Sequence, residues 1–327
     1  MIFDVNQTEF ESDYQRSIWH YATHIVPLEV SLADITDSEI REGCKQVYDC
    51  TMEILEDMYN NPDEYAPLSP RAFLNDYFLW IIRGGVLIKY RDRFERSLLL
   101  MPRHGFSYGE DMRTLSNPRY PLFADYLDKM AVLAKTKKQN LGGYLERRDF
   151  RLFNKRVTLT DDDLFRPLSD IHKSYFNELH NHALSIGAKL ERKGCYSFRY
   201  TYKKLHVLIL NNYFLQIEVP YRMNNAYNIE GQFERFLEIA ESQSDNDSLI
   251  AYMMRNLCIC DGCRGRAEGR KKINERCGKW VKIRDKKRFI SMCHPAVSKY
   301  NNSYDHGDIQ MLKRMVDIRI EQIESTT

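Results

Sequence analysis

The sequence has no long apolar run and no recognisable export signal. Its longest apolar stretch, residues 77–82, is far shorter than the roughly 18–20 residues of a membrane-spanning helix, so no membrane partner is expected. The first residues, Met1-Ile2-Phe3-Asp4, contain neither a basic n-region nor an apolar h-region. We therefore expect a cytoplasmic protein with reduced cysteines.

Motifs of familiar enzyme classes are also absent. The chain contains no Gly-rich phosphate loop, nucleophile elbow, kinase signature or dinucleotide fingerprint. These absences weigh against an enzyme but leave the question open. Total charge is close to balanced, with 48 Lys+Arg against 46 Asp+Glu. This balance argues against a protein that binds polyanions over its whole surface.

Cysteine is concentrated in one place. Five of the eight cysteines lie within the 36 residues from Cys258 to Cys293. The centre is Cys260-Asp261-Gly262-Cys263, a C-x-x-C turn whose two sulfurs converge on one ion. Zinc in structural sites takes four such ligands in a tetrahedron, so a second pair is expected elsewhere in the sequence.

A predicted hairpin supplies the second pair. Residues 280–283 and 288–292 are expected to be strands, joined by the polar turn 284–287. Pairing Ile283 with Arg288 places Cys277 opposite His294. The predicted metal ligands are therefore Cys260, Cys263, Cys277 and Cys293, with Cys258 and His294 as alternates.

Zinc is the preferred metal, and two alternatives remain. The C-x-C-x-x-C start followed by a later cysteine also suits an iron–sulfur cluster, which uses four thiolates. The cysteines also need not bind any metal. Disulfides are disfavoured in a protein that is not exported. A redox-active C-x-x-C is disfavoured because a helix precedes it and a basic loop follows it.

Basic residues gather around the same cysteines. Residues 251–327 contain 17 Lys+Arg against 9 Asp+Glu, whereas residues 1–250 contain 31 against 37. The predicted nucleic-acid-binding residues are Arg264, Arg266, Arg270, Lys271, Lys272, Lys282, Arg284, Lys286, Lys287 and Arg288. Such a face holds phosphates, so DNA or RNA is the expected partner of residues 264–288. The competing explanation is a solvated ribbon whose cations balance the negative charge of zinc thiolates.

Hydrophobic spacing predicts a mostly helical N-terminal part. Apolar residues recur at helical intervals over residues 9–26, 70–83 and 121–138. Thr36-Asp37-Ser38-Glu39 has the form of a capping box that opens a helix running to about residue 59. Residues 144–153 are expected to be a strand.

The remainder of the chain predicts mixed structure. Thr160-Asp161-Asp162-Asp163 caps a helix to about residue 186, and a three-stranded meander covers 195–202, 205–210 and 213–219. Three further helices are expected at 229–241, 247–257 and 307–324. The fold class is therefore α+β, with a helix–meander–helix layer and a C-terminal zinc-ribbon-like hairpin followed by a final helix. The predicted domains are 1–156, 157–245 and 246–327.

Three hypotheses about function follow. The first is a regulatory or nucleic-acid-binding protein with a structural zinc site and a basic C-terminal hairpin. The second is an enzyme or ligand-binding protein with a pocket between domains. A deep polar pocket that contains His104 or His172 would favour it. The third is an iron–sulfur redox sensor. Nothing in the sequence determines the oligomeric state.

Overall fold

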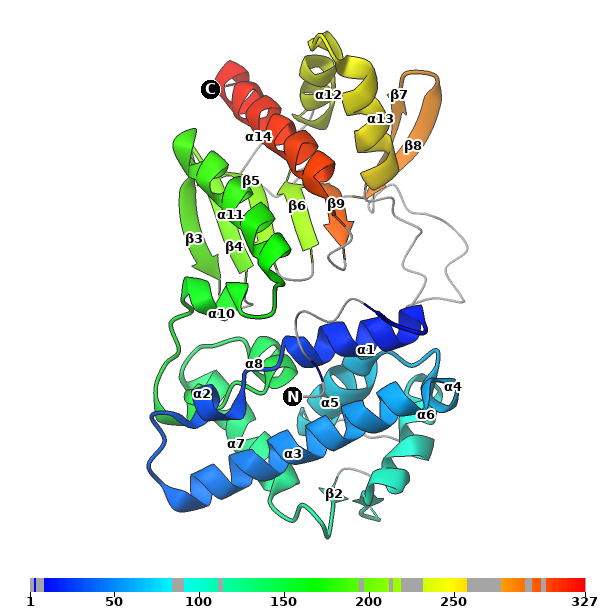
Figure 1. Ribbon diagram of the computed structural model, residues 1–327, viewed down its shortest axis with the longest axis vertical. Coiled ribbons are helices and arrows are strands. Elements are labelled where there is room, and N and C mark those ends of the chain that lie inside the picture. Colours follow the sequence, from blue (N-terminus) through cyan, green and yellow to red (C-terminus); the bar gives the residue numbers. More distant parts are fainter. Residues whose placement is uncertain are drawn as a thin grey trace. The chain divides into compact units, whose positions relative to one another are not determined.

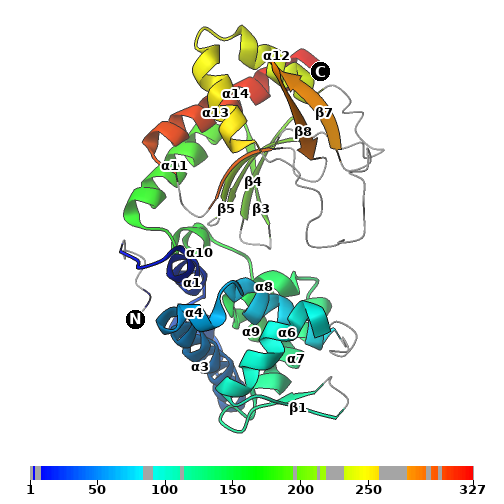
Figure 2. The same ribbon diagram turned by 90° about the vertical axis from the view of Figure 1, so that its right-hand side faces the viewer.

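The computed structural model contains two compact units, drawn from two sides in Figures 1 and 2. Unit 1 comprises Met1–Pro167 with Gly194–Tyr196, and unit 2 comprises Leu168–Lys193 with Ser197–Thr327. Helices and small antiparallel sheets occur together, which confirms the α+β class. The division into three domains stays a prediction. The structure describes residues 3, 9–83, 91–110, 114–193, 197–211, 214–218, 232–257, 278–291, 296–300 and 304–326.

Unit 1 is mainly helical. Its helices are α1 (Asp13–Thr23), α2 (Leu28–Leu32), α3 (Ser38–Asn60), α4 (Pro62–Tyr65), η1 (Ala72–Asp76), α5 (Tyr77–Ile82), α6 (Arg91–Leu100), η3 (Met101–His104), α7 (Phe123–Thr136), α8 (Leu141–Arg147), α9 (Arg151–Asn154) and α10 (Asp161–Phe165). A short antiparallel ribbon, β1 (Ser107–Tyr108) with β2 (Leu115–Ser116), lies between η3 and α7. The side chain of Asp37 accepts a hydrogen bond from the Ile40 N–H, so Asp37 and not Thr36 caps α3.

Residues 144–153 form helices, so the predicted strand there is wrong. The side chain of Asn140 accepts a hydrogen bond from the Gly142 N–H (3.0 Å) and starts α8. Tyr144 and Leu145 are adjacent and both fully buried. A half-buried strand would place two neighbours on opposite faces, whereas the packed helix buries both.

Helix α3 forms the centre of the unit 1 core. Cys44, Val47, Ile54 and Leu55 recur at helical spacing and are all buried. Helices α1 and α7 pack against α3. Cys44 and Cys50 are free, buried thiols within this core and pack as small apolar residues.

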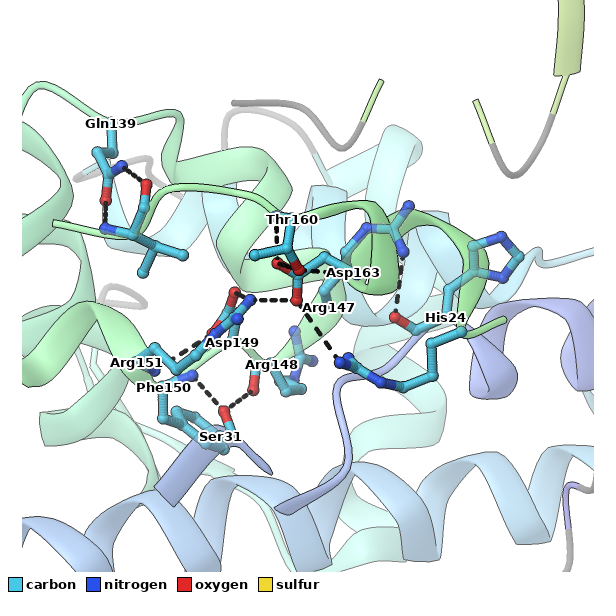
Figure 3. Close-up of polar contacts among 12 residues, drawn as sticks. His24, Ser31, Gln139, Arg147, Arg148, Asp149, Phe150, Arg151, Thr160 and Asp163 are labelled. Atoms are coloured by element: carbon cyan, nitrogen blue, oxygen red, sulfur yellow. Dashed lines mark hydrogen bonds and ion pairs between the residues drawn. The ribbon is translucent and has the colours of Figure 1, made fainter. Parts of the chain in front are cut away.

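A network of buried charged side chains lies in unit 1 around residues 147–151 (Figure 3). Arg148 ends α8 in a left-handed conformation (φ 50°) and is fully buried. Its guanidinium donates to Thr51 Oγ1 (2.8 Å), to the Leu74 carbonyl (3.1 Å) and to the Leu145 carbonyl. One buried side chain thereby connects α3, η1 and α8.

A second cation in the network has two carboxylate partners. Arg151 lies 2.7 Å from Asp149 Oδ2 and 2.8 Å from Asp163 Oδ1 (Figure 3). Burial alone would raise the pKa of Asp163, but hydrogen bonds from Thr160 and Arg151 lower it overall. The predicted helix cap at Thr160 is present, and Thr160 and Asp163 form a capping box at the start of α10. The network joins α9 to α10.

Unit 2 combines a sheet, a hairpin and four helices among its described residues. Its elements are α11 (Asp170–Ser185), β3 (Lys189–Lys193), β4 (Ser197–Tyr202), β5 (Leu205–Asn211), β6 (Phe214–Glu218), α12 (Gln232–Ser242), α13 (Asn246–Asn256), β7 (Gly278–Ile283), β8 (Lys286–Ser291), β9 (Ala296–Tyr300) and α14 (His306–Thr326). Within the described residues, no helix has the length and apolarity needed to cross a membrane.

The predicted meander is the middle of a larger sheet. Its strands follow the order β3-β4-β5-β6-β9, and every neighbouring pair is antiparallel. Strands β3 and β9 were not expected from the sequence. Strand β9 follows residue 245, the predicted boundary between the second and third domains. The sheet therefore joins segments from both sides of that boundary.

Helices α11 and α14 cover one face of this sheet (Figures 1 and 2). The rings of Phe176 and Phe198 lie 6.2 Å apart, and His180 Nδ1 lies 2.6 Å from the Tyr200 hydroxyl. Leu208 and Leu210 on the central strand are fully buried. Burial of this apolar face gives unit 2 its layered core.

Candidate functional site

The hairpin predicted from the sequence is present, with a different register. Gly278 pairs with Ser291 and Ile283 pairs with Lys286, so only Arg284 and Asp285 form the turn. Arg284 takes a left-handed backbone conformation (φ 52°), which a two-residue hairpin turn requires. The predicted pairing of Ile283 with Arg288 is therefore wrong. Consequently Lys286 and Lys287 belong to strand β8 and not to a loop.

The two faces of the β7–β8 hairpin differ in character. Val281 and Ile283 are only 5% and 1% exposed, so they occupy the buried face. Lys282 lies between them in sequence and is exposed. Its partner across the ladder is Lys287, which is also exposed. The hairpin therefore buries Val281 and Ile283 on one face, which also includes the exposed Lys286 near the turn, and carries the exposed pair of Lys282 and Lys287 on the other face.

One of the predicted phosphate-binding residues already has a carboxylate partner. The Arg284 guanidinium lies 2.5 Å from the Asp247 carboxylate and 3.3 Å from the Asn246 side-chain oxygen. Both partners are in the first turn of α13. Arg284 thus links the hairpin turn to α13 through an exposed ion pair, and its part in phosphate binding stays a prediction.

No such partner accompanies the lysines of the hairpin. Within the described part of the chain, no carboxylate lies at ion-pair distance from Lys282, Lys286 or Lys287. Their charges are available to a ligand. The backbone of Arg288 lies in β8, opposite Val281.

Most of the other predicted site residues lie outside the described residues. These are Cys258, Cys260, Cys263, Cys277, Cys293 and His294, with the basic residues Arg264, Arg266, Arg270, Lys271 and Lys272. In the described segments, no three His, Cys, Asp or Glu side chains form a group that could hold a metal ion. The zinc site therefore stays a prediction.

The described residues next to the cysteines are paired with one another. Leu257, which directly precedes Cys258, forms an antiparallel bridge with Val297, four residues after Cys293. Gly278, which directly follows Cys277, pairs with Ser291, two residues before Cys293. The described residues that flank 258–277 and 292–295 are therefore paired with neighbours in unit 2.

The histidines considered for an enzyme site are parts of packed structure. His104 in unit 1 is 3% exposed, and its Nε2 lies 2.7 Å from the Tyr65 hydroxyl. That hydroxyl also donates to the Asp57 carboxylate. Burial lowers the pKa of His104, and the nearby Asp57 carboxylate only partly opposes this shift. A neutral, buried imidazole in a core fits a packing role better than a role in catalysis.

His172 in unit 2 has a comparable environment. Its Nδ1 lies 2.7 Å from the Ser169 hydroxyl, and its ring meets that of Tyr304 edge-on at 4.9 Å. Tyr304 is 5% exposed. These contacts fix the first turn of α11 against the segment that precedes α14. This arrangement also fits packing better than catalysis.

Sequence reasoning missed the buried charges of unit 1. Arg148, Asp149 and Asp163 were not expected in the interior, because arginine and aspartate are normally exposed. The one signal in the sequence was the high density of charged residues in 146–151. In an isolated helix these side chains would all lie in solvent, so the pattern alone did not indicate burial. No family model, curated protein or solved structure matches the chain.

Proposed function

We propose that this protein binds nucleic acid through unit 2, where a zinc-ribbon-like β7–β8 hairpin presents lysines to phosphate groups. The observation that carries the proposal is the exposed cross-strand pair of Lys282 and Lys287 on a hairpin whose Val281 and Ile283 are buried. Phosphate contacts by lysine and arginine supply most of the affinity of sequence-independent binding.

The pairing around the cysteines supports the metal part of the proposal. Consecutive Cα atoms are about 3.8 Å apart, so Cys258 and Cys277 each lie one short step from a described ladder residue. Cys293 is two residues from Ser291, and Ser291 pairs with Gly278. This connectivity favours a common site for Cys277 and Cys293 even though the predicted register was wrong.

The ligand set remains Cys260, Cys263, Cys277 and Cys293, with Cys258 and His294 as alternates. Four thiolates, or three thiolates and an imidazole, suit tetrahedral zinc. In this arrangement the ion ties residues 264–276, with their six basic side chains, to the open end of the hairpin. A structural zinc site therefore serves binding by positioning the basic segment.

Metal content is the first test. Protein purified without oxygen is expected to contain about one zinc per chain and no visible colour. Cys263→Ser should lose the metal, because ligation and local folding are coupled. The matched control is Cys50→Ala, which removes a buried thiol of α3 and should keep the zinc. Iron with sulfide would replace this proposal by the redox-sensor hypothesis, and protein without any metal would contradict the zinc site.

Binding is tested separately with the full chain. A mixed-sequence DNA or RNA oligonucleotide should bind at 50 mM salt and weaken steeply as salt rises, because binding releases counterions. Replacing both Lys282 and Lys287 by Gln should reduce the salt dependence. The control replaces Lys45 and Lys173, two lysines outside the hairpin, by Gln. Absence of binding at low salt would contradict the proposed function.

A further inference from the structure

Helix α7 of unit 1 borders an open hollow of about 580 Å³. Helices α3 and α9 pack against α7 and supply the rest of its lining. The volume falls in the range of about 300–1,000 Å³ that is usual for sites that bind other molecules. The apolar residues of the lining include Ile40, Val132, Leu133 and Phe153. The hollow is therefore large enough and apolar enough to accept side chains of a second molecule.

The apolar lining is accessible from solvent. Val132 is 65% exposed, whereas most apolar side chains of unit 1 are buried. It shares the hollow with Ile40 and Phe153, which are both partly exposed. A single exposed apolar residue is ordinary on a protein surface, but adjoining apolar residues with a polar rim are typical of a protein–protein interaction site.

Asp128 lies at the edge of this hollow without a cationic partner. Within the part of unit 1 that the structure describes, no basic side chain lies at ion-pair distance from its carboxylate. Lys129 is the one basic residue of the described lining, and it is already paired with Asp125 (2.8 Å) and Glu39 (3.7 Å). Burial raises the pKa of Asp128, and the negative charge of Asp125 raises it further. A cation bound at Asp128 would therefore stabilise its ionised form.

A second hollow meets the first at Asp128. It has a volume of about 290 Å³, and its apolar lining includes Phe78, Ile81, Ile82 and Leu115. The α7 residues that line it are Ala124, Leu127 and Asp128, so it lies on a different side of the helix. Asp128 is thus flanked by apolar surface on both sides.

Charge and shape together indicate what this surface binds. A purely apolar ligand would cover Asp128 and leave its charge unpaired, which costs free energy. An acidic ligand would be repelled by Asp128, Asp37 and Glu39. A cation between two apolar groups avoids both penalties. An amphipathic helix provides this arrangement, because residues three or four positions apart lie on one face.

We infer that the α7 surface formed by Asp128 and its two flanking hollows binds a basic amphipathic helix of a partner protein. A lysine or arginine of that helix pairs with Asp128. Apolar residues three or four positions before and after this cation enter the two hollows. The inference concerns unit 1 and does not depend on nucleic-acid binding by unit 2.

The test uses two fluorescein-labelled, alanine-rich helical peptides and the full chain. The basic probe has leucine at positions 6 and 13 and arginine at position 9. The matched probe differs only by glutamate at position 9. In fluorescence anisotropy at low salt we expect the basic probe to bind at least about tenfold more tightly, because like charges placed together across an interface are strongly unfavourable.

Three variants assign the binding to α7. Asp128→Asn should weaken the basic probe and bring the affinities of the two probes together. Val132→Ser should weaken both probes, because apolar contact is common to them. Asp162→Asn, which also removes an exposed carboxylate of unit 1, should change neither affinity. All three positions are exposed, and circular dichroism checks that each variant is folded.

A photo-crosslinking version of the basic probe shows where it binds. Benzoylphenylalanine in place of the leucine at position 13 should cross-link to residues that line the two hollows, as mapped by mass spectrometry. Cross-links confined to other parts of the chain would overturn the inference.

The remaining outcomes are equally decisive. Equal affinity for both probes, or binding of the basic probe that Asp128→Asn leaves unchanged, would overturn the inference. Failure of the basic probe to bind at low salt would also overturn it. Dimerisation of the chain in sedimentation velocity, abolished by Val132→Ser, would overturn it by showing that a second copy covers α7.

Discussion

The ring of Tyr126 in α7 lies directly over the backbone of Gly43 in α3. A Cβ atom built at Gly43 would approach three ring atoms of Tyr126 to 2.3–2.4 Å. Tyr126 is only 1% exposed, so the ring has little room to move. Glycine is needed here because it lets two helices approach closely, and not for any unusual backbone angle.

Gly43→Ala should therefore destabilise unit 1. Alanine improves helix propensity by up to about 1 kcal/mol. Overpacking of a filled core typically costs about 1–3 kcal/mol, so we expect a net loss of about 1 kcal/mol or more. Urea unfolding followed by circular dichroism measures the change. Glu42→Ala, at an exposed neighbouring position of the same helix, is the control, and an unchanged midpoint for Gly43→Ala would contradict the close contact.

Stability should depend on pH through His104. Burial holds the pKa of His104 below its usual range in the folded protein, whereas the unfolded chain has a value of about 6.5. As pH falls below about 6.5, the unfolded state takes up a proton that the folded state resists. Stability contributed by neutral His104 is therefore present above this pH and is lost as pH falls towards the folded pKa.

A variant isolates this contribution from that of other histidines. The loss of stability between pH 7.5 and 5.5 should be smaller in His104→Gln than in the natural chain. His306→Gln, at an exposed position at the start of α14, should retain the full loss. Equal pH dependence in all three proteins would contradict a neutral, buried His104.

Loss of the Asp163 carboxylate should destabilise the charged network of unit 1. Asp163→Asn keeps the shape of the side chain but removes one of the two charges that compensate half-buried Arg151. Breaking one partner of a buried ion pair costs about 3–5 kcal/mol, and the remaining Asp149 contact should limit the loss to about 2–3 kcal/mol. Chemical denaturation measures the effect. Asp162→Asn, exposed in the same turn, should change stability by less than about 0.5 kcal/mol.

The network also predicts sensitivity to acid. The pKa of Asp163 is lowered in the folded protein relative to an unfolded value of about 3.9. Its contribution is therefore present above about pH 4 and is lost as pH falls through the folded pKa. In Asp163→Asn the midpoint of acid unfolding should move to higher pH and its steepness should fall. Acid unfolding identical to that of the natural chain would contradict the contribution.

The two described cysteines should resist thiol reagents. Burial raises the pKa of Cys44 and of Cys50 to about 12, so almost no thiolate exists at neutral pH. Alkylation with iodoacetamide at pH 7.5, mapped by mass spectrometry, should leave both unmodified in the folded protein and modify both in urea. Rapid modification without denaturant would show that α3 opens more readily than its packing indicates.

The sequence by itself determined the local structural features of this protein. Short-range rules identified the helix cap at Thr160, the existence of the hairpin and the apolar stripe of α3. A cap, a turn and a periodic stripe each depend on residues within a few positions of one another. For the same reason the basic and cysteine-rich character of residues 258–294 was visible without coordinates.

Tertiary structure alone decided the features that depend on distant partners. Strand β3 is rich in charge and β9 is short, so neither shows a strong strand pattern until β4 and β6 provide partners. The hairpin register was set by a two-residue turn at Arg284. The basic residues around it do not reveal the position of this turn from the sequence. Arg148 is buried because Thr51, Leu74 and Leu145 lie around it. Burial of a charge is favourable only where distant groups satisfy it, and their positions are a property of the folded chain.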